Sequence, residues 1–180
     1  MLNRIFFACL FLGLYSSGSS LTCRWMKDKF QQFGKEMLDE LEAMATNSTN
    51  ATDDGPTVSF PEELYSQASG ASAQDKLAFV VQILEEVAAL FEEDHSSASW
   101  ENRTVENFLL VVSQQADELS SCIGGHKKKN RKLHMYFKRL SDHILNRMGH
   151  SAEAWQLIRT EAESHVRRAH HLASSTHNAN

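Results

Sequence analysis

Cysteine placement is the feature that most limits how this sequence can fold. The first of three cysteines, Cys9, lies within an apolar run of 11 residues, "IFFACLFLGLY". A membrane-spanning helix needs about 20 apolar residues, so this run is typical of a cleaved signal peptide and not of a membrane anchor. We therefore expect residues 1–22 to be a signal peptide, and residues 23–180 to form one secreted, extracellular helical domain that does not insert into membranes.

Cleavage leaves two cysteines, Cys23 and Cys122. In an oxidising compartment they most simply form one disulfide, and the alternative is two separate buried thiols. Cleavage before Ser19 instead of Cys23 would leave the same pair. Three sequons agree with secretion and make Asn47, Asn50 and Asn102 the candidate glycosylation sites.

The apolar pattern predicts helices along the rest of the chain. Apolar residues recur every three to four positions in five long segments, which predicts five long helices and an all-α fold. The segments cover about residues 26–44, 73–93, 100–122, 130–148 and a final stretch that ends before "SSTHNAN". We expect Ser99 and Ser151 to cap the third and fifth helices, and Gly149 to end the fourth.

Link lengths and the disulfide together predict the direction of each helix. The first link has about 27 residues and can return the chain along a helix of about 30 Å, whereas the other links are short and make antiparallel neighbours. A disulfide needs Cα atoms within about 7 Å, and only parallel first and second helices bring Cys122 beside Cys23. The prediction is an up-up-down-down four-helix bundle of the cytokine type, with the fourth of the five helices as a crossover.

Charge is divided unevenly along the chain. Residues 23–125 hold 6 Lys/Arg against 19 Asp/Glu, and residues 126–180 hold 11 against 4. A nucleic-acid-binding domain would be basic throughout, so nucleic acid is excluded as a partner. The run "KKKNRK", residues 127–132, is either a solvated surface or a patch that binds heparin or steers a receptor.

Residues that could carry catalysis form no constellation. The serines lie in caps and links, and no glycine-rich phosphate loop is present. His134, His143 and His165 are expected along helix surfaces, and the pair His170-His171 in a disordered tail. His-Glu-x-x-His is absent, so nothing has metal-ligand spacing. We expect no enzyme activity, no catalytic residue, no metal site and no cofactor.

Several short segments stand out along nearly the whole mature chain. They are Phe60-Pro61, Leu90-Phe91, the stretch from Ser96 to Trp100, Gln114-Gln115 before Cys122, Tyr136-Phe137 with Arg139, and "AWQLIRTE" at 154–161. In this order they resemble segments of vertebrate type I interferons (the interferon alpha/beta family). Each piece is moderately specific, and together they make a strong match. The resemblance implies an interferon-like fold, with Trp155, Tyr136 and Phe137 in packing roles.

Two departures from the family pattern refine the resemblance. Glu153 stands where many mammalian members have a cysteine of a second disulfide. The single bridge therefore resembles the two-cysteine group of bony fish, whose pair joins the mature N-terminus to the end of the third helix, here Cys23 and Cys122. Gln156 replaces the acidic residue common after the tryptophan, a change that we expect to matter little.

The resemblance also implies a function. It is that of a secreted antiviral cytokine, a monomer, that binds and bridges two class II cytokine receptor chains of the interferon alpha/beta receptor type and activates JAK-STAT signalling and antiviral gene expression. In the family, one receptor contacts the long first loop and the last helix, and the other contacts a face built largely from helices two to four. Another secreted helical cytokine with different receptor use, and a non-signalling helical domain, are the alternatives.

The last helix carries the receptor-binding candidates. Arg159 stands where the family has a receptor-contacting arginine, and Glu163 lies one turn later. Arg159 is about 100° around the helix from the inward-facing Ile158, so we expect its side chain to be exposed.

Overall fold

The computed structural model describes residues 29–45, 58–124 and 128–176, and within these ranges it is all-helical, with no strand. The helices are one at 29–43, α2 (Glu62–Ser69), α3 (Ala73–Phe91), a 3-10 turn η1 (Ser96–Ala98), α4 (Asn102–Cys122), α5 (Arg131–Leu140), a π-helical turn η2 (Ser141–Asn146) and α6 (Ala152–Ser174). The five predicted long helices are confirmed. Within the first link, α2 is an additional short helix that the sequence pattern did not predict.

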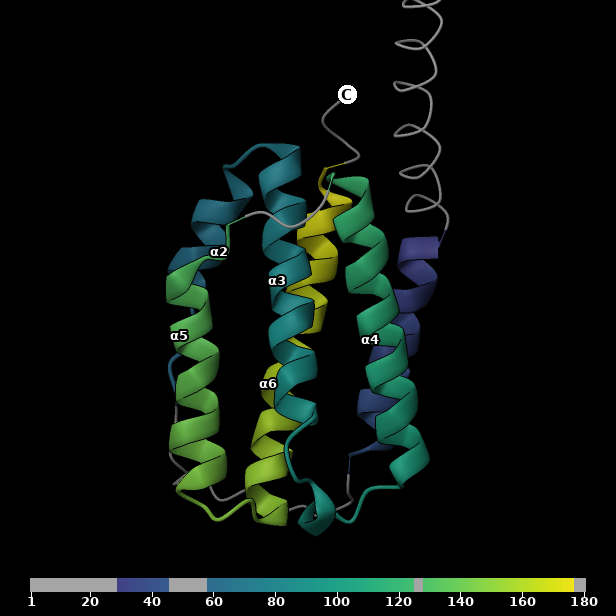
Figure 1. The fold of residues 1–180 in the computed structure, drawn as a ribbon, viewed down its shortest axis with the longest axis vertical. Coiled ribbons are helices and arrows are strands. Elements are labelled where there is room, and N and C mark those ends of the chain that lie inside the picture. The colour runs from purple at the N-terminus through teal and green to yellow at the C-terminus, as the bar shows by residue number, and fades with distance from the viewer. Residues whose placement is uncertain (1–28, 46–57, 125–127, 177–180) are drawn as a thin grey trace, which may run out of the picture.

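The helix at 29–43 lies antiparallel to α4 and α6. Gln115, late in α4, donates from Nε2 to the Phe30 carbonyl over 3.4 Å. Asn107, early in α4, donates from Nδ2 to Glu40 Oε1 over 3.3 Å. The contacts therefore run in opposite order along the two helices, and α6 follows α4 in direction (Figure 1).

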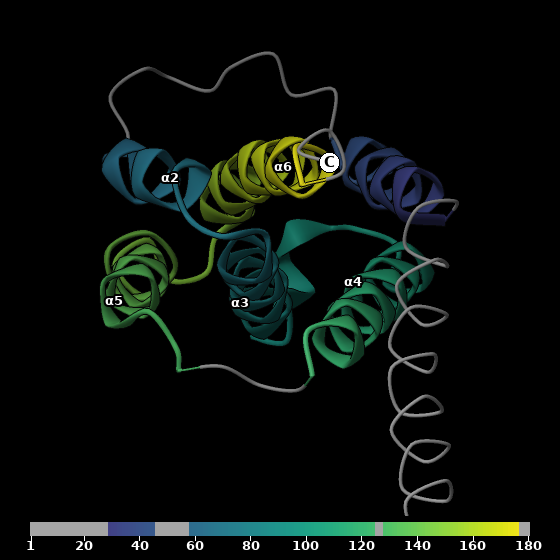
Figure 2. The ribbon, with the colours of Figure 1, turned by 90° about the horizontal axis from the view of Figure 1, so that it is seen from above.

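Contacts of α3 establish that it is parallel to the helix at 29–43. Gln74, at the start of α3, donates to the carbonyl of Ile123 just past α4 over 2.9 Å, and the rings of Phe91 and Phe108 meet 4.7 Å apart at the other ends. Since α3 and the helix at 29–43 are both antiparallel to α4, they run the same way (Figures 1 and 2). The up-up-down-down bundle is confirmed, with α5 as the crossover.

The start of α5 is joined to α3. Asn130 N donates to Gln82 Oε1 over 2.7 Å, and Gln82 Nε2 donates back to the Asn130 carbonyl over 3.0 Å. One turn later His134 Nδ1 lies 3.0 Å from Glu86 Oε1. The two pairs advance together, so α5 runs parallel to α3, and it lies beside α2 at one side of the bundle (Figure 2).

Large side chains from all long helices fill one core. Trp155 is fully buried between Phe91, at 6.1 Å between rings, and Trp100, at 5.7 Å. Tyr136 and Phe137 are also buried. These burials confirm the packing roles expected for the aromatic residues of the family segments.

Turn chemistry explains most helix ends. Ser151 Oγ accepts from Ala154 N over 3.2 Å, which confirms Ser151 as the cap of α6, and Gly149 has the left-handed φ of 60° expected at a helix stop. Ser99 does not cap α4. It takes a left-handed φ of 57° at the end of η1, and α4 begins three residues later at Asn102, with Glu101 at the N-cap position.

Candidate functional site

Both receptor-binding candidates lie on α6, and the exposure predicted for Arg159 was wrong. The Arg159 side chain is only 13% exposed. Its guanidinium reaches to the end of the helix at 29–43, where Nη1 donates to the Leu41 carbonyl over 3.3 Å. The angle of a residue around its own helix does not report a neighbouring helix that covers it.

Arg159 and Gln156 together cap the C-terminal end of the helix at 29–43. The last carbonyls of a helix lack intrahelical partners. Arg159 serves Leu41, and Gln156 Nε2 donates to the Met44 carbonyl over 3.3 Å. Arg159 Nε also donates to Gln156 Oε1 over 3.1 Å, so the two caps support each other. Gln156, a departure expected to matter little, therefore makes a tertiary contact.

Glu163 lies between two arginines on the outer side of α6. Arg167 Nη2 donates to its Oε1 over 2.7 Å, and Arg159 Nη1 donates to its Oε2 over 3.1 Å. The bonds from Arg167, followed by those from Arg159, hold the pKa of Glu163 below its usual range. Thr160 is exposed beside them. We call Gln156, Arg159, Thr160, Glu163 and Arg167 the α6 edge.

His165, expected on a helix surface, is instead fully buried at the centre of a polar chain. Tyr65 of α2 places its hydroxyl 2.7 Å from His165 Nδ1, and Tyr136 of α5 places its hydroxyl 3.2 Å from Nε2. Tyr136 in turn donates to Glu161 Oε1. The Phe60 ring stacks on the imidazole at 4.6 Å between centroids. One histidine thus joins α2, α5 and α6.

The bonds fix the order of protons along this chain. The Tyr136 hydroxyl donates a hydrogen bond to Glu161, so its oxygen accepts from His165 Nε2–H. The other ring nitrogen of His165, Nδ1, then accepts from the Tyr65 hydroxyl. Burial lowers the pKa of His165 to about 3, so the ring is neutral at physiological pH. Burial also raises the pKa of both tyrosines and of Glu161. The chain is a fixed structural network of satisfied groups.

Arg168 fastens the end of the first link to α6 from outside. Its guanidinium lies 4.6 Å above the Phe60 ring and forms an ion pair with Glu62. Together with the buried chain below, this contact joins residues 60–65 to α6.

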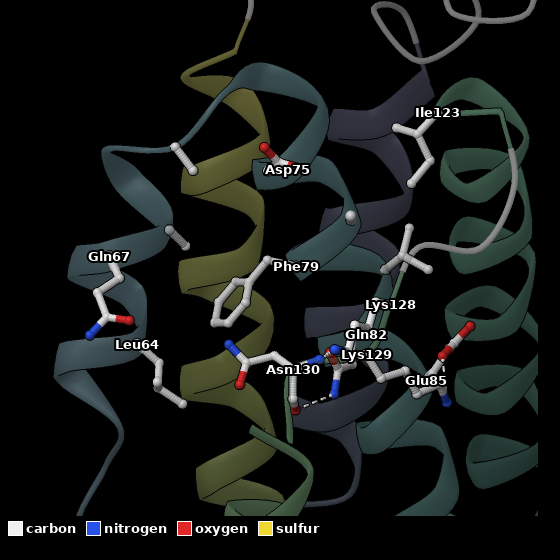
Figure 3. Close-up of a pocket in the computed structure, with 14 residues that line it drawn as sticks. Leu64, Gln67, Asp75, Phe79, Gln82, Glu85, Ile123, Lys128, Lys129 and Asn130 are labelled. Carbon is white, nitrogen blue, oxygen red and sulfur yellow. Dashed lines mark hydrogen bonds and ion pairs between the residues drawn. The ribbon is translucent and has the colours of Figure 1, made fainter. Parts of the chain in front are cut away.

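A pocket of about 230 Å³ lies between α2, α3 and the start of α5 (Figure 3). Leu64, Phe79 and Ile123 supply its apolar wall, and the paired Gln82 and Asn130 lie at its floor. Gln82 bonds to Asn130, and Lys129 pairs with Glu85, so four polar residues of the pocket are engaged with one another. Within the described ranges no group of His, Cys, Asp and Glu is arranged to hold a metal ion.

The other predicted site residues fall partly outside the described ranges. Cys122 ends α4 and is disulfide-bonded, and Asn102 is exposed at the start of α4. Cys23, Asn47 and Asn50 lie outside the described residues. Among the helices described, none is long and apolar enough to span a membrane.

Comparison with known proteins identifies the family. The interferon alpha/beta domain matches residues 26–176. Interferon a3 of Oncorhynchus mykiss is 31% identical over 168 residues, which cover 93% of this chain and 94% of the trout protein. Interferon tau-9 of Ovis aries is 28% identical over 84% of this chain and 82% of its own length.

A solved structure agrees with these sequence matches. Zebrafish interferon 1 superposes with a TM-score of 0.72 at 26% identity, over 86% of this chain and 99% of that one. The homologues are cytokines and not enzymes. The chain therefore belongs to the interferon alpha/beta family, and it is a type I interferon of the fish kind.

Proposed function

We propose that this interferon is secreted as an antiviral cytokine that bridges two class II cytokine receptor chains, activates JAK-STAT signalling and induces antiviral genes. The observation that supports this most strongly is the direct contact between the end of the first link and α6. In the family, one receptor contacts the first loop and the last helix. Here Arg168 and His165 hold those two segments together.

The α6 edge is the proposed contact for this receptor. Arg159, a candidate from the family resemblance, caps the first helix and also belongs to the edge. We propose that it supports the fold and contacts the receptor. Glu163 is kept charged by the arginines on either side of it. Two members of the edge are accessible to a receptor: the Arg167 side chain is 61% exposed, and Thr160 is exposed beside Arg159.

The second receptor is proposed to bind the α3 and α4 part of the face that the family builds from helices two to four. Leu110 of α4 is 66% exposed. A single exposed leucine is ordinary on a protein surface, so Leu110 marks a position for substitution and does not by itself define the interface.

The test is signalling in fish cells by the purified protein. Thr160→Arg places a bulky cation on the α6 edge without touching the core, and Gln31→Arg, exposed on the helix at 29–43, is the matched control. We expect wild type and Gln31→Arg to induce STAT phosphorylation and antiviral genes and to protect cells, and Thr160→Arg to need at least about 10-fold more protein. Equal potency of the two variants would contradict the α6 edge.

The readouts also separate the alternative classes. STAT phosphorylation without antiviral gene induction or protection would favour a helical cytokine of different receptor use. Absence of all three readouts from the folded wild-type protein would overturn the interferon activity itself.

The covalent features are proposed on the same basis. A Cys23–Cys122 disulfide and glycans at Asn47, Asn50 and Asn102 are expected in the secreted protein. A non-reducing peptide map should contain the joined cysteine peptides, and glycosidase treatment should lower the intact mass. A peptide map with both cysteines unpaired would contradict the proposed disulfide.

A further inference from the structure

The outer side of α5 differs in charge from every other long helix described. Residues 131–140, "RKLHMYFKRL", hold four cations and no acid, whereas the helix at 29–43, α3, α4 and α6 each mix acidic and basic residues. All four cations are exposed: Arg131, Lys132, Lys138 and Arg139. We call these four residues the α5 strip.

The spacing of the α5 strip makes it linear. Arg131 and Lys132 precede Lys138 and Arg139 by seven residues, which is two helical turns, or about 10 Å along the axis. Met135, 41% exposed, lies between the two pairs on the same side. The result is two pairs of positive charge in a row with an apolar position between them.

The members of the strip differ in whether an acid is paired with them. Lys138 pairs with Asp142 at 2.8 Å, and the nearby Lys129 pairs with Glu85 at 3.0 Å. In the part of the chain that the structure describes, Arg131, Lys132 and Arg139 take part in no ion pair.

A cleft of about 530 Å³ runs between the strip and α2. Arg131, Lys132 and Arg139 line one wall, and the acids Glu62 and Glu63 line the other. Within the described residues neither acid forms an ion pair with the strip. Glu62 is engaged by Arg168, and Glu63 accepts from Gln67 Nε2 over 3.1 Å.

Two cations of the strip lie at an electrostatically unfavourable position of the helix. Arg131 and Lys132 occupy the first turn of α5, where the positive end of the helix dipole favours acids, and no acid is present there. Asn130 caps this turn by accepting from Lys132 N and Leu133 N, and its bonds to Gln82 fix it to α3 (Figure 3). The positive charge is therefore concentrated on a rigid support.

We propose that the α5 strip binds a linear sulfated polysaccharide. Repeated sulfates along a flexible chain complement two cation pairs in a row, and such binding needs charge more than shape. A protein partner is less well matched, because the core of a protein interface is depleted in charge and is anchored by buried aromatic residues, whereas this strip offers four cations and one exposed methionine. The inference rests on the proposed function only in placing the protein outside the cell.

The structure refines the alternatives that the run at 127–132 left open. Lys129 is paired with Glu85, whereas Arg131 and Lys132 of the same run join Lys138 and Arg139 on the face of α5. The whole protein carries a net charge of −5, so attraction to a polyanion has to come from this local strip and should weaken steeply with salt.

The test uses heparin as the probe and the full chain expressed in cultured cells and purified. Wild type is compared with Arg131→Gln/Lys132→Gln/Arg139→Gln, and with a control of equal charge change, Lys29→Gln/Lys35→Gln/Arg103→Gln, on the far side of the bundle. Affinity is measured against salt, with hyaluronan, which has carboxylates but no sulfates, as a second ligand.

We expect the α5 variant to bind heparin at least about 10-fold more weakly than wild type at 0.15 M salt, with a shallower salt dependence, and the control to match wild type. Hyaluronan should bind none of them. Equal loss in both variants, or no binding by wild type, would overturn the proposal. Unchanged heparin binding with loss of STAT phosphorylation would assign the strip to a receptor instead.

Because heparin binding is measured without cells, a failure of the signalling assay leaves the result of this experiment unaffected, and the two proposals can fail separately.

Discussion

The arginines of α6 and the cations of α5 contrast sharply within one small bundle. On α6, Arg159 caps the first helix, Arg167 bonds to Glu163, and Arg168 lies on Phe60 beside Glu62. On α5, Arg131 and Arg139 have no ion-pair partner within the described residues. The cations of α6 therefore stabilise the fold through contacts with other residues, whereas those of α5 stay available to a binding partner.

This difference predicts where substitutions will be felt. Side chains tied to buried partners should lower the free energy of unfolding when they are removed. Exposed cations without partners should leave stability unchanged and alter only binding.

The largest loss is expected where the buried chain is interrupted. His165→Phe keeps an aromatic ring beside Phe60 but leaves the hydroxyls of Tyr65 and Tyr136 without a nitrogen partner, so unfolding free energy should fall by about 2–4 kcal/mol. Adding Tyr65→Phe removes the hydroxyl that His165→Phe leaves unpaired and should recover part of the loss, whereas the Tyr136 hydroxyl keeps its bond to Glu161. Urea unfolding measures both variants. If His165→Phe leaves the unfolding free energy unchanged, the buried chain does not stabilise the fold as proposed.

Acid should destabilise the protein through the same histidine. The pKa of His165 is about 3 in the folded state, against about 6.5 when unfolded, so between these values the unfolded state binds the extra proton. Stability contributed by this group is full above about pH 6.5 and falls by about 1.4 kcal/mol per unit as pH drops toward 3. Glu161, whose pKa is raised by burial, opposes part of this fall.

Unfolding measured from pH 7 to pH 4 tests the acid effect. The slope for wild type should exceed that for His165→Phe, in which the titrating group is gone. Equal slopes would mean that other groups set the acid sensitivity.

A close approach of two helices should make Gly34 sensitive to a single methyl group. A Cβ at Gly34 would overlap the ring of His170, which stacks on Phe30 at 4.9 Å between centroids. Gly34→Ala should lower unfolding free energy by about 1–2 kcal/mol, although alanine is favoured over glycine in a helix. Gly34→Ala/His170→Ala removes the overlap, and if it is no more stable than Gly34→Ala, steric overlap is not the cause.

Arg159→Ala is expected to cost about 1–2 kcal/mol, because the Leu41 carbonyl loses its donor. Arg159→Lys keeps the charge with a different donor geometry and should lose less. Thermal unfolding and signalling potency are measured on both variants. A loss of potency in Arg159→Lys beyond its loss of stability would indicate direct receptor contact, whereas no loss of stability in Arg159→Ala would contradict the cap.

The smallest effect is expected on α5. Arg131→Gln/Lys132→Gln/Arg139→Gln should leave unfolding free energy unchanged or raise it by up to about 0.5 kcal/mol, because two cations leave the positive end of a helix. Urea unfolding beside the control triple variant measures this. A loss above about 1 kcal/mol would show that the α5 strip has a structural role.

Much of the fold was predictable from periodicity and link length. The apolar stripes predicted the five long helices, and the long first link with one disulfide predicted the parallel pair. Ser151 and Gly149 were predictable because their local chemistry decides the turn. α2 was missed because eight residues inside a polar link give too short a stripe to recognise.

The tertiary roles of polar residues were less predictable. His165 follows Ile158 and Ala162 at helical spacing, so the stripe itself could have predicted its burial. His170, expected in a disordered tail, lies in α6 against Phe30. The contacts of Arg159 could not be read from α6, because they depend on where another helix ends.

Paired measurement of signalling and heparin binding tests the division between the two regions most directly. Thr160→Arg on the α6 edge and the triple variant on the α5 strip are each assayed for STAT phosphorylation, in fish cells depleted of sulfated polysaccharide, and for heparin affinity. We predict that Thr160→Arg loses signalling and keeps heparin binding, and that the α5 variant does the reverse. Loss of both properties in either variant, with folding intact, would contradict the account.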